Sequence, residues 1–182
     1  MSARDLVAAF AAPAVALFAI GLSGAFASGA ARDPYPFGGA VDHLTADEAR
    51  MHAAIIFERA DLDRSGALDA DEFASLAIVT AELTRLNGFI AIETGGDDAD
   101  IVPLPIEAPS ALSAGERARV EAVARADFYA MAGEDARLTI DEYLGEKSAA
   151  FEAADRNRDG ALVRAELAAF AAGEAMIVRS DA

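Results

Sequence analysis

The sequence has no cysteine and no tryptophan, and it contains only two histidines, His43 and His52. Without cysteine, the chain can form no disulfide and can offer no thiolate to a metal ion. Neither histidine stands beside a serine-nucleophile motif, and acid–base or nucleophilic catalysis needs such groups to converge on one site. We therefore predict that the protein is not an enzyme.

Basic residues are scarce, with 15 lysines and arginines against 31 aspartates and glutamates, for a formal net charge of −16. A protein that binds nucleic acid needs a basic footprint on its surface, so we predict no nucleic-acid partner. The negative charge also raises the local concentration of divalent cations. A solubilising surface would have the same composition, and the two roles are compatible.

Long apolar runs are limited to one stretch near the start of the chain, residues 6–27. Arg4 precedes it, and it ends in Ala25-Phe26-Ala27, with small residues where a signal peptidase cuts. We predict that residues 1–27 are a signal peptide and that the mature protein is periplasmic or secreted, with no membrane association. The alternative is a retained N-terminal anchor, because the run is about long enough to cross a bilayer.

What the sequence does contain is a twelve-residue stretch, 61–72, that reads D-L-D-R-S-G-A-L-D-A-D-E. A calcium ion takes about six to eight oxygens, and loop positions 1, 3, 5, 7, 9 and 12 can supply them. Gly66 occupies position 6, where the loop turns sharply. The predicted ligands are Asp61, Asp63, Ser65, the backbone carbonyl of Ala67, Asp69 (directly or through water) and both carboxylate oxygens of Glu72.

A second stretch, 155–166, repeats the scheme as D-R-N-R-D-G-A-L-V-R-A-E. Val163 at position 9 cannot orient a bridging water, so this loop has three carboxylates against four in the first. A solvated acidic turn is the simpler alternative, but two complete matches favour metal binding. We predict two Ca²⁺ ions, bound more weakly at 155–166. The predicted ligands of the second loop are Asp155, Asn157, Asp159, the backbone carbonyl of Ala161 and Glu166.

The similarity extends beyond the ligands. An F-E-x-A-D pattern precedes both loops, at 57–61 and 151–155, and Gly-Ala-Leu recurs at 66–68 and 160–162. With these residues the chain resembles the EF-hand calcium-binding superfamily, in the form of an exported bacterial-type protein. The resemblance implies an all-α fold of helix–loop–helix units, and it places the leucine at position 8 of each loop in a short strand that pairs with another loop.

A degenerate third copy covers residues 131–142 and ends in R-L-T-I-D-E, as the first loop ends in A-L-D-A-D-E. Met131 and Gly133 replace the first two ligands and Ala136 replaces the glycine. A thioether is a poor ligand for a hard cation, so we predict a metal-free loop that supports its metal-bound neighbour. An unusual site that uses Glu134, Asp135 and backbone carbonyls is the alternative.

The spacing between the last two loops is compact, because residues 143–154 suffice for a single shared helix. This resembles lanmodulin and some other bacterial calcium-binding proteins, so lanthanide binding is a further alternative. The proline that lanmodulin has at loop position 2 is absent, since Leu62 and Arg156 stand there.

Capping boxes at Thr45–Glu48 and Ser113–Glu116 predict two helix starts, and Asn87-Gly88 predicts a helix end. A short β-hairpin is predicted around 89–106, with its prolines at an edge. The predicted organisation is a linker at 28–44, a first EF-hand at 45–88, a connector at 89–112, and a degenerate plus an intact EF-hand at 113–176.

Two functions remain open from the sequence. In the first, calcium is a structural staple or a buffered ion. In the second, calcium changes helix angles and exposes a groove to an unknown protein partner. Calcium sensors tend to have methionine-rich grooves, and the chain has only four methionines, so the first function is favoured.

Overall fold

The computed structural model describes residues 39–95, 99–106 and 108–175. The chain divides into two units, Met1–Pro34 and Tyr35–Ala182, and all described residues belong to the second. The predicted signal peptide or anchor and the linker up to residue 38 therefore lie outside the described residues. Within the described residues, no helix combines the length and the apolar character needed to span a bilayer.

In the described part of the chain, five helices contain most of the residues and the strands are short. This confirms the predicted mainly helical fold, and the expected shared helix is α4. The helices are α1 (Ala46–Ala60), α2 (Ala70–Asn87), α3 (Ala114–Ala132), α4 (Ile140–Ala154) and α5 (Ala165–Glu174). The strands are β1 (His43–Thr45), β2 (Ala67–Leu68), β3 (Phe89–Ile92), β4 (Asp100–Pro103), β5 (Leu138–Thr139) and β6 (Ala161–Val163).

Helices α1 to α4 each begin at a capping box, in which side chains satisfy free backbone amides. At the start of α1, the Thr45 hydroxyl accepts a hydrogen bond from the Glu48 amide, and the Glu48 carboxylate accepts one from the Thr45 amide at 2.8 Å. At the end of α2, Gly88 adopts a left-handed conformation with φ 76°, and its amide donates to the Thr84 carbonyl at 2.8 Å. Both boundaries were predicted from these residues.

The strands form three antiparallel pairs in the described residues. Strands β3 and β4 make the predicted hairpin, in which Phe89 lies opposite Pro103. Strand β2 of the first predicted loop pairs with β5, and β6 of the second loop pairs with β1. The two intact loops therefore do not pair with each other.

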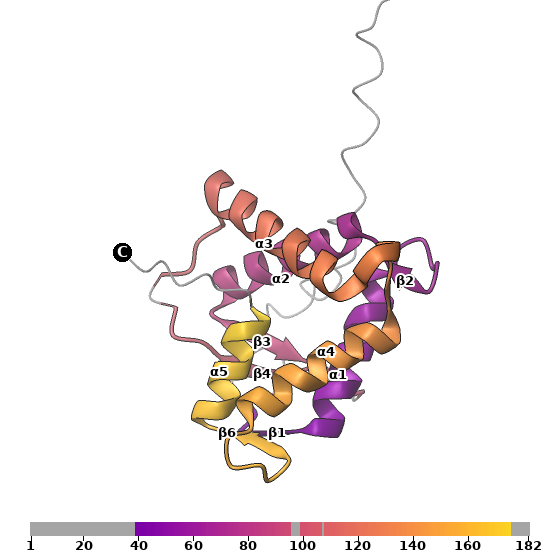
Figure 1. The fold of residues 1–182 in the computed structure, drawn as a ribbon. Coiled ribbons are helices and arrows are strands. Elements are labelled where there is room, and N and C mark those ends of the chain that lie inside the picture. The colour runs from indigo at the N-terminus through magenta and orange to yellow at the C-terminus, as the bar shows by residue number, and fades with distance from the viewer. Residues whose placement is uncertain (1–38, 96–98, 107, 176–182) are drawn as a thin grey trace, which may run out of the picture. The chain divides into compact units, whose positions relative to one another are not determined.

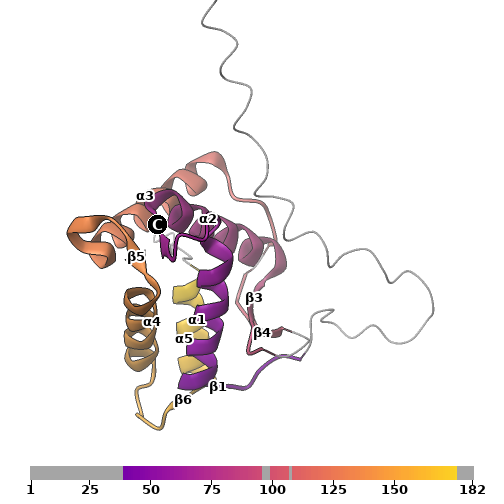
Figure 2. The same ribbon diagram turned by 90° about the vertical axis from the view of Figure 1, so that its right-hand side faces the viewer.

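Helices α1 and α4 pack against each other, and both run between the β1–β6 pair and the β2–β5 pair (Figures 1 and 2). Helix α1 begins at the β1–β6 pair and ends at Ala60, directly before Asp61, the first residue of loop 61–72. Helix α4 begins at the β2–β5 pair and ends at Ala154, directly before Asp155, the first residue of loop 155–166. Because each helix begins where the other ends, the two run in opposite directions.

Among the residues that the structure describes, the buried core forms two clusters, one around each pair of loop strands. One cluster surrounds Leu68 and Leu138 and includes Phe57 and Tyr143, whose ring centroids are 5.6 Å apart. The other surrounds Leu44 and Leu162 and includes the hairpin residues Ile90, Ile92, Val102 and Leu104. Each loop pair thus has its own apolar support, supplied by residues at loop position 8 and by the helices beside them.

His52 is a buried polar residue on α1, and it ties that helix to the hairpin. Its Nδ1 accepts a hydrogen bond from the Glu93 amide at 3.0 Å. Burial lowers the pKa of His52 below its ordinary value, because the charged imidazolium would lose its hydration. The carboxylates of Glu174 and Glu93 oppose this shift, while the cations Lys147 and Arg59 act with it. The neutral form is therefore the one that the fold stabilises.

The buried imidazole predicts a loss of stability in mild acid. When the pH falls from about 7.5 to about 5.5, His52 of the unfolded chain takes up a proton near its ordinary pKa of 6.5, whereas the folded protein resists it. The free energy of unfolding, measured by urea denaturation at fixed calcium, should decrease over this range. In His52→Gln, whose amide oxygen can still accept the Glu93 hydrogen bond, the decrease should be largely absent.

The matched control is His43→Gln, because His43 is exposed and its hydrogen bond to Asp42 raises its pKa. A group whose pKa is raised in the folded state stabilises the protein at low pH, and this stabilisation is lost as the pH rises. His43 therefore does not cause the loss of stability in acid, and His43→Gln should show the same decrease in the free energy of unfolding as the parent protein. Equal pH dependence in the parent and in His52→Gln would contradict the assignment.

Candidate metal centre

Loop 61–72 is wrapped around the carboxylate of its first residue. The Asp61 oxygens accept hydrogen bonds from the amides of Ser65 and Gly66, each at 2.9 Å. The Ser65 amide also donates to Asp63 Oδ1 at 2.9 Å. Gly66 has φ 80°, a left-handed conformation that a residue with a Cβ rarely adopts. The loop is therefore already closed by its own backbone.

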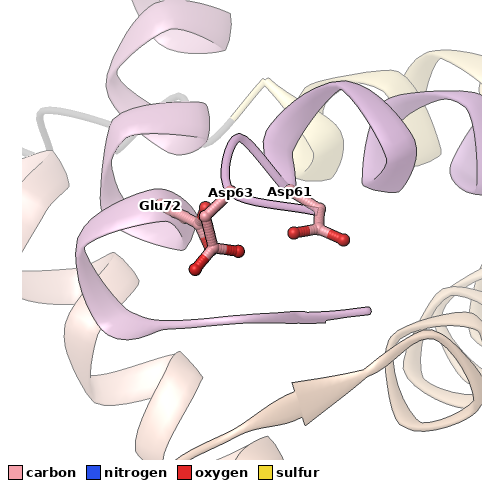
Figure 3. Close-up of side chains that lie close together, drawn as sticks. All are labelled: Asp61, Asp63 and Glu72. Carbon is pink, nitrogen blue, oxygen red and sulfur yellow. The ribbon is translucent and has the colours of Figure 1, made fainter. Parts of the chain in front are cut away.

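Three carboxylates converge inside this loop, with one oxygen each from Asp61, Asp63 and Glu72 lying within 4.8 Å of the others (Figure 3). Oxygens that share one calcium ion at about 2.3–2.6 Å lie at most about 5 Å apart. Asp61 follows the last turn of α1 and Glu72 belongs to the first turn of α2. The loop thus presents converging oxygens from both flanking helices, which fits a divalent cation.

The other predicted ligands of this loop have varied surroundings. The Ser65 hydroxyl donates to the Ala67 carbonyl at 2.8 Å, so these two oxygens are adjacent. Asp69 is the N-cap of α2, and its Oδ1 accepts hydrogen bonds from the amides of Asp71 and Glu72 at 2.8 Å. Asp69 does not belong to the converging group of three, which agrees with a role through a bridging water.

The Asp63 carboxylate is held in its charged form. The hydrogen bond from the Ser65 amide is the largest cause that lowers the pKa of Asp63 below its usual value. Arg137 adds a smaller effect in the same direction through its charge. At neutral pH this ligand therefore needs to lose no proton before a cation binds.

Loop 155–166 repeats the same internal hydrogen bonds. The buried carboxylate of Asp155 accepts from the Gly160 amide at 2.9 Å, and Asn157 Oδ1 accepts from the Asp159 amide at 2.9 Å. Glu166 Oε1 accepts from the Arg156 amide at 3.1 Å. The second loop therefore shares the internal hydrogen bonds of the first at its start and at position 12, although its acidic side chains form no converging group of three within the described residues.

Glu166 Oε2 is the atom of the second loop that most directly favours a bound cation. This oxygen is buried and has no hydrogen-bond partner among the described residues. A buried acceptor without a partner costs about 1–3 kcal/mol, and more when it carries charge. A cation held by both oxygens of Glu166 would remove this cost, so the donor set of the second loop also fits calcium.

The second loop is nevertheless less complete than the first. Val163 supplies no side-chain oxygen at position 9, and α5 has no side-chain cap where Asp69 caps α2. Arg164, at the start of α5, has φ 47°, which is unfavourable for a residue with a Cβ. These differences agree with weaker binding at 155–166.

The degenerate segment 131–142 lacks the shape of a metal loop. Helix α3 continues through Met131 to Ala132, and a 3₁₀ turn follows at Gly133–Asp135. Ala136 keeps the left-handed turn, with φ 52°, where the intact loops have glycine. Glu134 and Asp135 belong to no converging group of three acidic residues in the described part of the chain. What the segment retains is Leu138 in β5, paired with Leu68.

A further segment resembles the end of an EF-hand loop and was not predicted from the sequence. Residues 43–48, H-L-T-A-D-E, have the same pattern as R-L-T-I-D-E at 137–142. Leu44 lies opposite Leu162 as Leu138 lies opposite Leu68, and the Ala46 amide donates to the Gly160 carbonyl at 3.3 Å. The predicted linker 28–44 therefore ends inside β1. The signal was the shared L-T-x-D-E pattern.

Comparison with known families gives the same two segments. A family model described as EF hand matches residues 53–77 and 147–171, which enclose the two intact loops and the adjoining helices. Both segments are EF-hands. Comparison with curated proteins and with solved structures gives no significant match. The two EF-hands indicate calcium binding, in agreement with the sequence and with the geometry of the loops.

The difference between the EF-hands predicts an order of affinities. Calorimetric titration with Ca²⁺ should detect two sites, with the tighter one at 61–72. Glu72→Gln should weaken calcium affinity at the tighter site, and Glu166→Gln should weaken it at the weaker site. Each loss should be about tenfold or more, because even outer-shell changes at metal sites cost about 10–100-fold in affinity. A third strong site, or loss of the weaker site in Glu72→Gln, would contradict this order.

Proposed function

We propose that the protein is an exported, non-enzymatic calcium-binding protein in which two Ca²⁺ ions act as structural staples or are buffered. The convergence of Asp61, Asp63 and Glu72 within an EF-hand is the observation that carries the proposal. The unpartnered Glu166 Oε2 supports a second ion at the other EF-hand. Export is supported by the apolar stretch 6–27 and the small residues at its end, Ala25 and Ala27.

The staple role follows from the position of the loops. Each loop connects the last turn of one helix to the first turn of the next, so an ion with ligands at positions 1 and 12 fixes the angle between them. The ion also cancels part of the repulsion among carboxylates in a chain of net charge −16. Cation binding therefore contributes directly to the free energy of folding.

A second candidate function, a calcium-responsive module for a protein partner, has one observation in its favour. A hollow of about 470 Å³ lies beside the first loop, and its lining includes the apolar side chains of Phe57 and Ile140 together with Asp61. A cation at Asp61 would alter the wall of this hollow. Lanthanide binding is a further alternative, since lanthanides also favour oxygen-rich loops.

The staple role predicts a large effect of calcium on thermal stability. At a hundredfold excess over Kd, one ion that binds only the folded state stabilises it by about 2.7 kcal/mol, which raises the melting temperature by about 5–10 °C. Replacing calcium by a chelator should therefore lower the melting temperature by at least this amount. Helix content at room temperature, measured by circular dichroism, should change much less, because the apolar clusters persist.

Melting curves recorded over a range of calcium, magnesium and lanthanum concentrations separate the alternatives. Larger stabilisation by lanthanum at far lower concentration would favour the lanthanide alternative. Calcium-dependent binding of an apolar dye at the hollow lined by Phe57 and Ile140 would favour the responsive module. Identical melting curves in calcium and chelator would show that the loops are irrelevant to stability and would contradict the staple role.

A further inference from the structure

Arg137 reaches from the degenerate segment into the first EF-hand loop. It directly precedes β5, and its side chain is exposed. Its Nη2 donates a hydrogen bond to Ser65 Oγ at 3.2 Å. Ser65 is the predicted ligand at loop position 5. Among the described residues, Arg137 forms no ion pair with a carboxylate, so its side-chain contact in this region is with a candidate metal ligand.

This contact opposes cation binding in two ways. A hydroxyl oxygen has two lone pairs, and the guanidinium occupies one of them while offering no acceptor of its own. The guanidinium also places a positive charge beside the oxygens that would surround Ca²⁺, and like charges at such separations repel. A cation that uses Ser65 Oγ must either displace Arg137 or bind in its field.

We propose that Arg137 limits the affinity of loop 61–72 for divalent cations. The arginine comes from the degenerate segment 131–142, whose strand β5 pairs with the loop. The inference rests on the proposed calcium-binding function and deepens it. The degenerate segment then has a role beyond packing, because it sets how tightly its partner binds metal.

The second EF-hand lacks this device. The residue that corresponds to Arg137 in the strand register is His43, since both directly precede the leucine that pairs with loop position 8. The His43 side chain is exposed and hydrogen-bonds its neighbour Asp42 at 2.9 Å. The arginine therefore acts on the first loop alone. The first loop has four carboxylates and the second has three, so Arg137 makes the difference in calcium affinity between the two loops smaller than this count would produce.

A charge series at this position tests the proposal: Arg137→Lys, Arg137→Gln and Arg137→Glu, each in a Glu166→Gln background that isolates loop 61–72. Calcium affinity would be measured by competition with a chromophoric chelator at low and high salt. Arg137→Gln should tighten binding by about three- to tenfold at low salt, the scale expected for an exposed charge acting on a divalent ion. Arg137→Glu should tighten it further, and Arg137→Lys should stay within about twofold of the parent.

Salt dependence provides a second readout that altered packing would not produce. The gain in Arg137→Gln should shrink at about 1 M salt, where the screening length is about 3 Å. The matched control is Arg119→Gln, which makes the same change in net charge on α3, where the arginine bonds the Gly115 carbonyl. This control should leave the affinity of the loop nearly unchanged.

The outcomes separate this inference from the proposed function. If the parent protein binds calcium at loop 61–72 and the whole series binds equally, the inference alone is overturned. If Arg119→Gln tightens binding as much as Arg137→Gln, net charge explains the effect and the inference is again overturned. If the parent binds no calcium at this loop, the proposed function fails with it. Should Glu166→Gln fold poorly, the Gly66 amide resonance reports occupancy of the same loop without that substitution.

Discussion

The pairing of each EF-hand loop with a short strand from outside the two EF-hand loops is the constraint on which the rest of the structure depends. Leu68 and Leu138, and likewise Leu44 and Leu162, lie opposite each other at positions that are at most 1% exposed. Two-residue or three-residue strands are too short to be stable alone, so each pair is held by the apolar cluster beneath it. An EF-hand loop of this chain therefore keeps its shape because another segment supports position 8.

The same pairing makes α1 and α4 common to both sites. Helix α1 starts beside Gly160 of the second loop and leads into Asp61 of the first. Helix α4 starts opposite Ala67 of the first loop and leads into Asp155 of the second. A cation in either loop would restrain both helices, and His52 of α1 accepts a hydrogen bond from the Glu93 amide directly after β3. Stability, metal binding and the charge of Arg137 thus act on one connected set of elements.

The sequence was informative where the signal is local. The ligand positions, the glycines with positive φ, the capping boxes and the hairpin each depend on a few neighbouring residues, and the structure has the loops, caps and hairpin where they were predicted. The pairing partners were not predictable in the same way, because a strand of two or three residues has no periodicity to detect. Leu44 was missed for this reason, and the contact of Arg137 with Ser65 spans 72 residues and depends on the tertiary pairing of β2 with β5.

The measurement that tests the account most directly is a crystal structure of the calcium-loaded protein with anomalous diffraction to locate the ions. We expect one ion at 61–72 with ligands from Asp61, Asp63 and Glu72, and one at 155–166 held by both oxygens of Glu166. We expect no ion at 131–142 or beside residues 43–48. An ion in either ligand-poor segment, or an empty loop 61–72 at saturating calcium, would contradict the account.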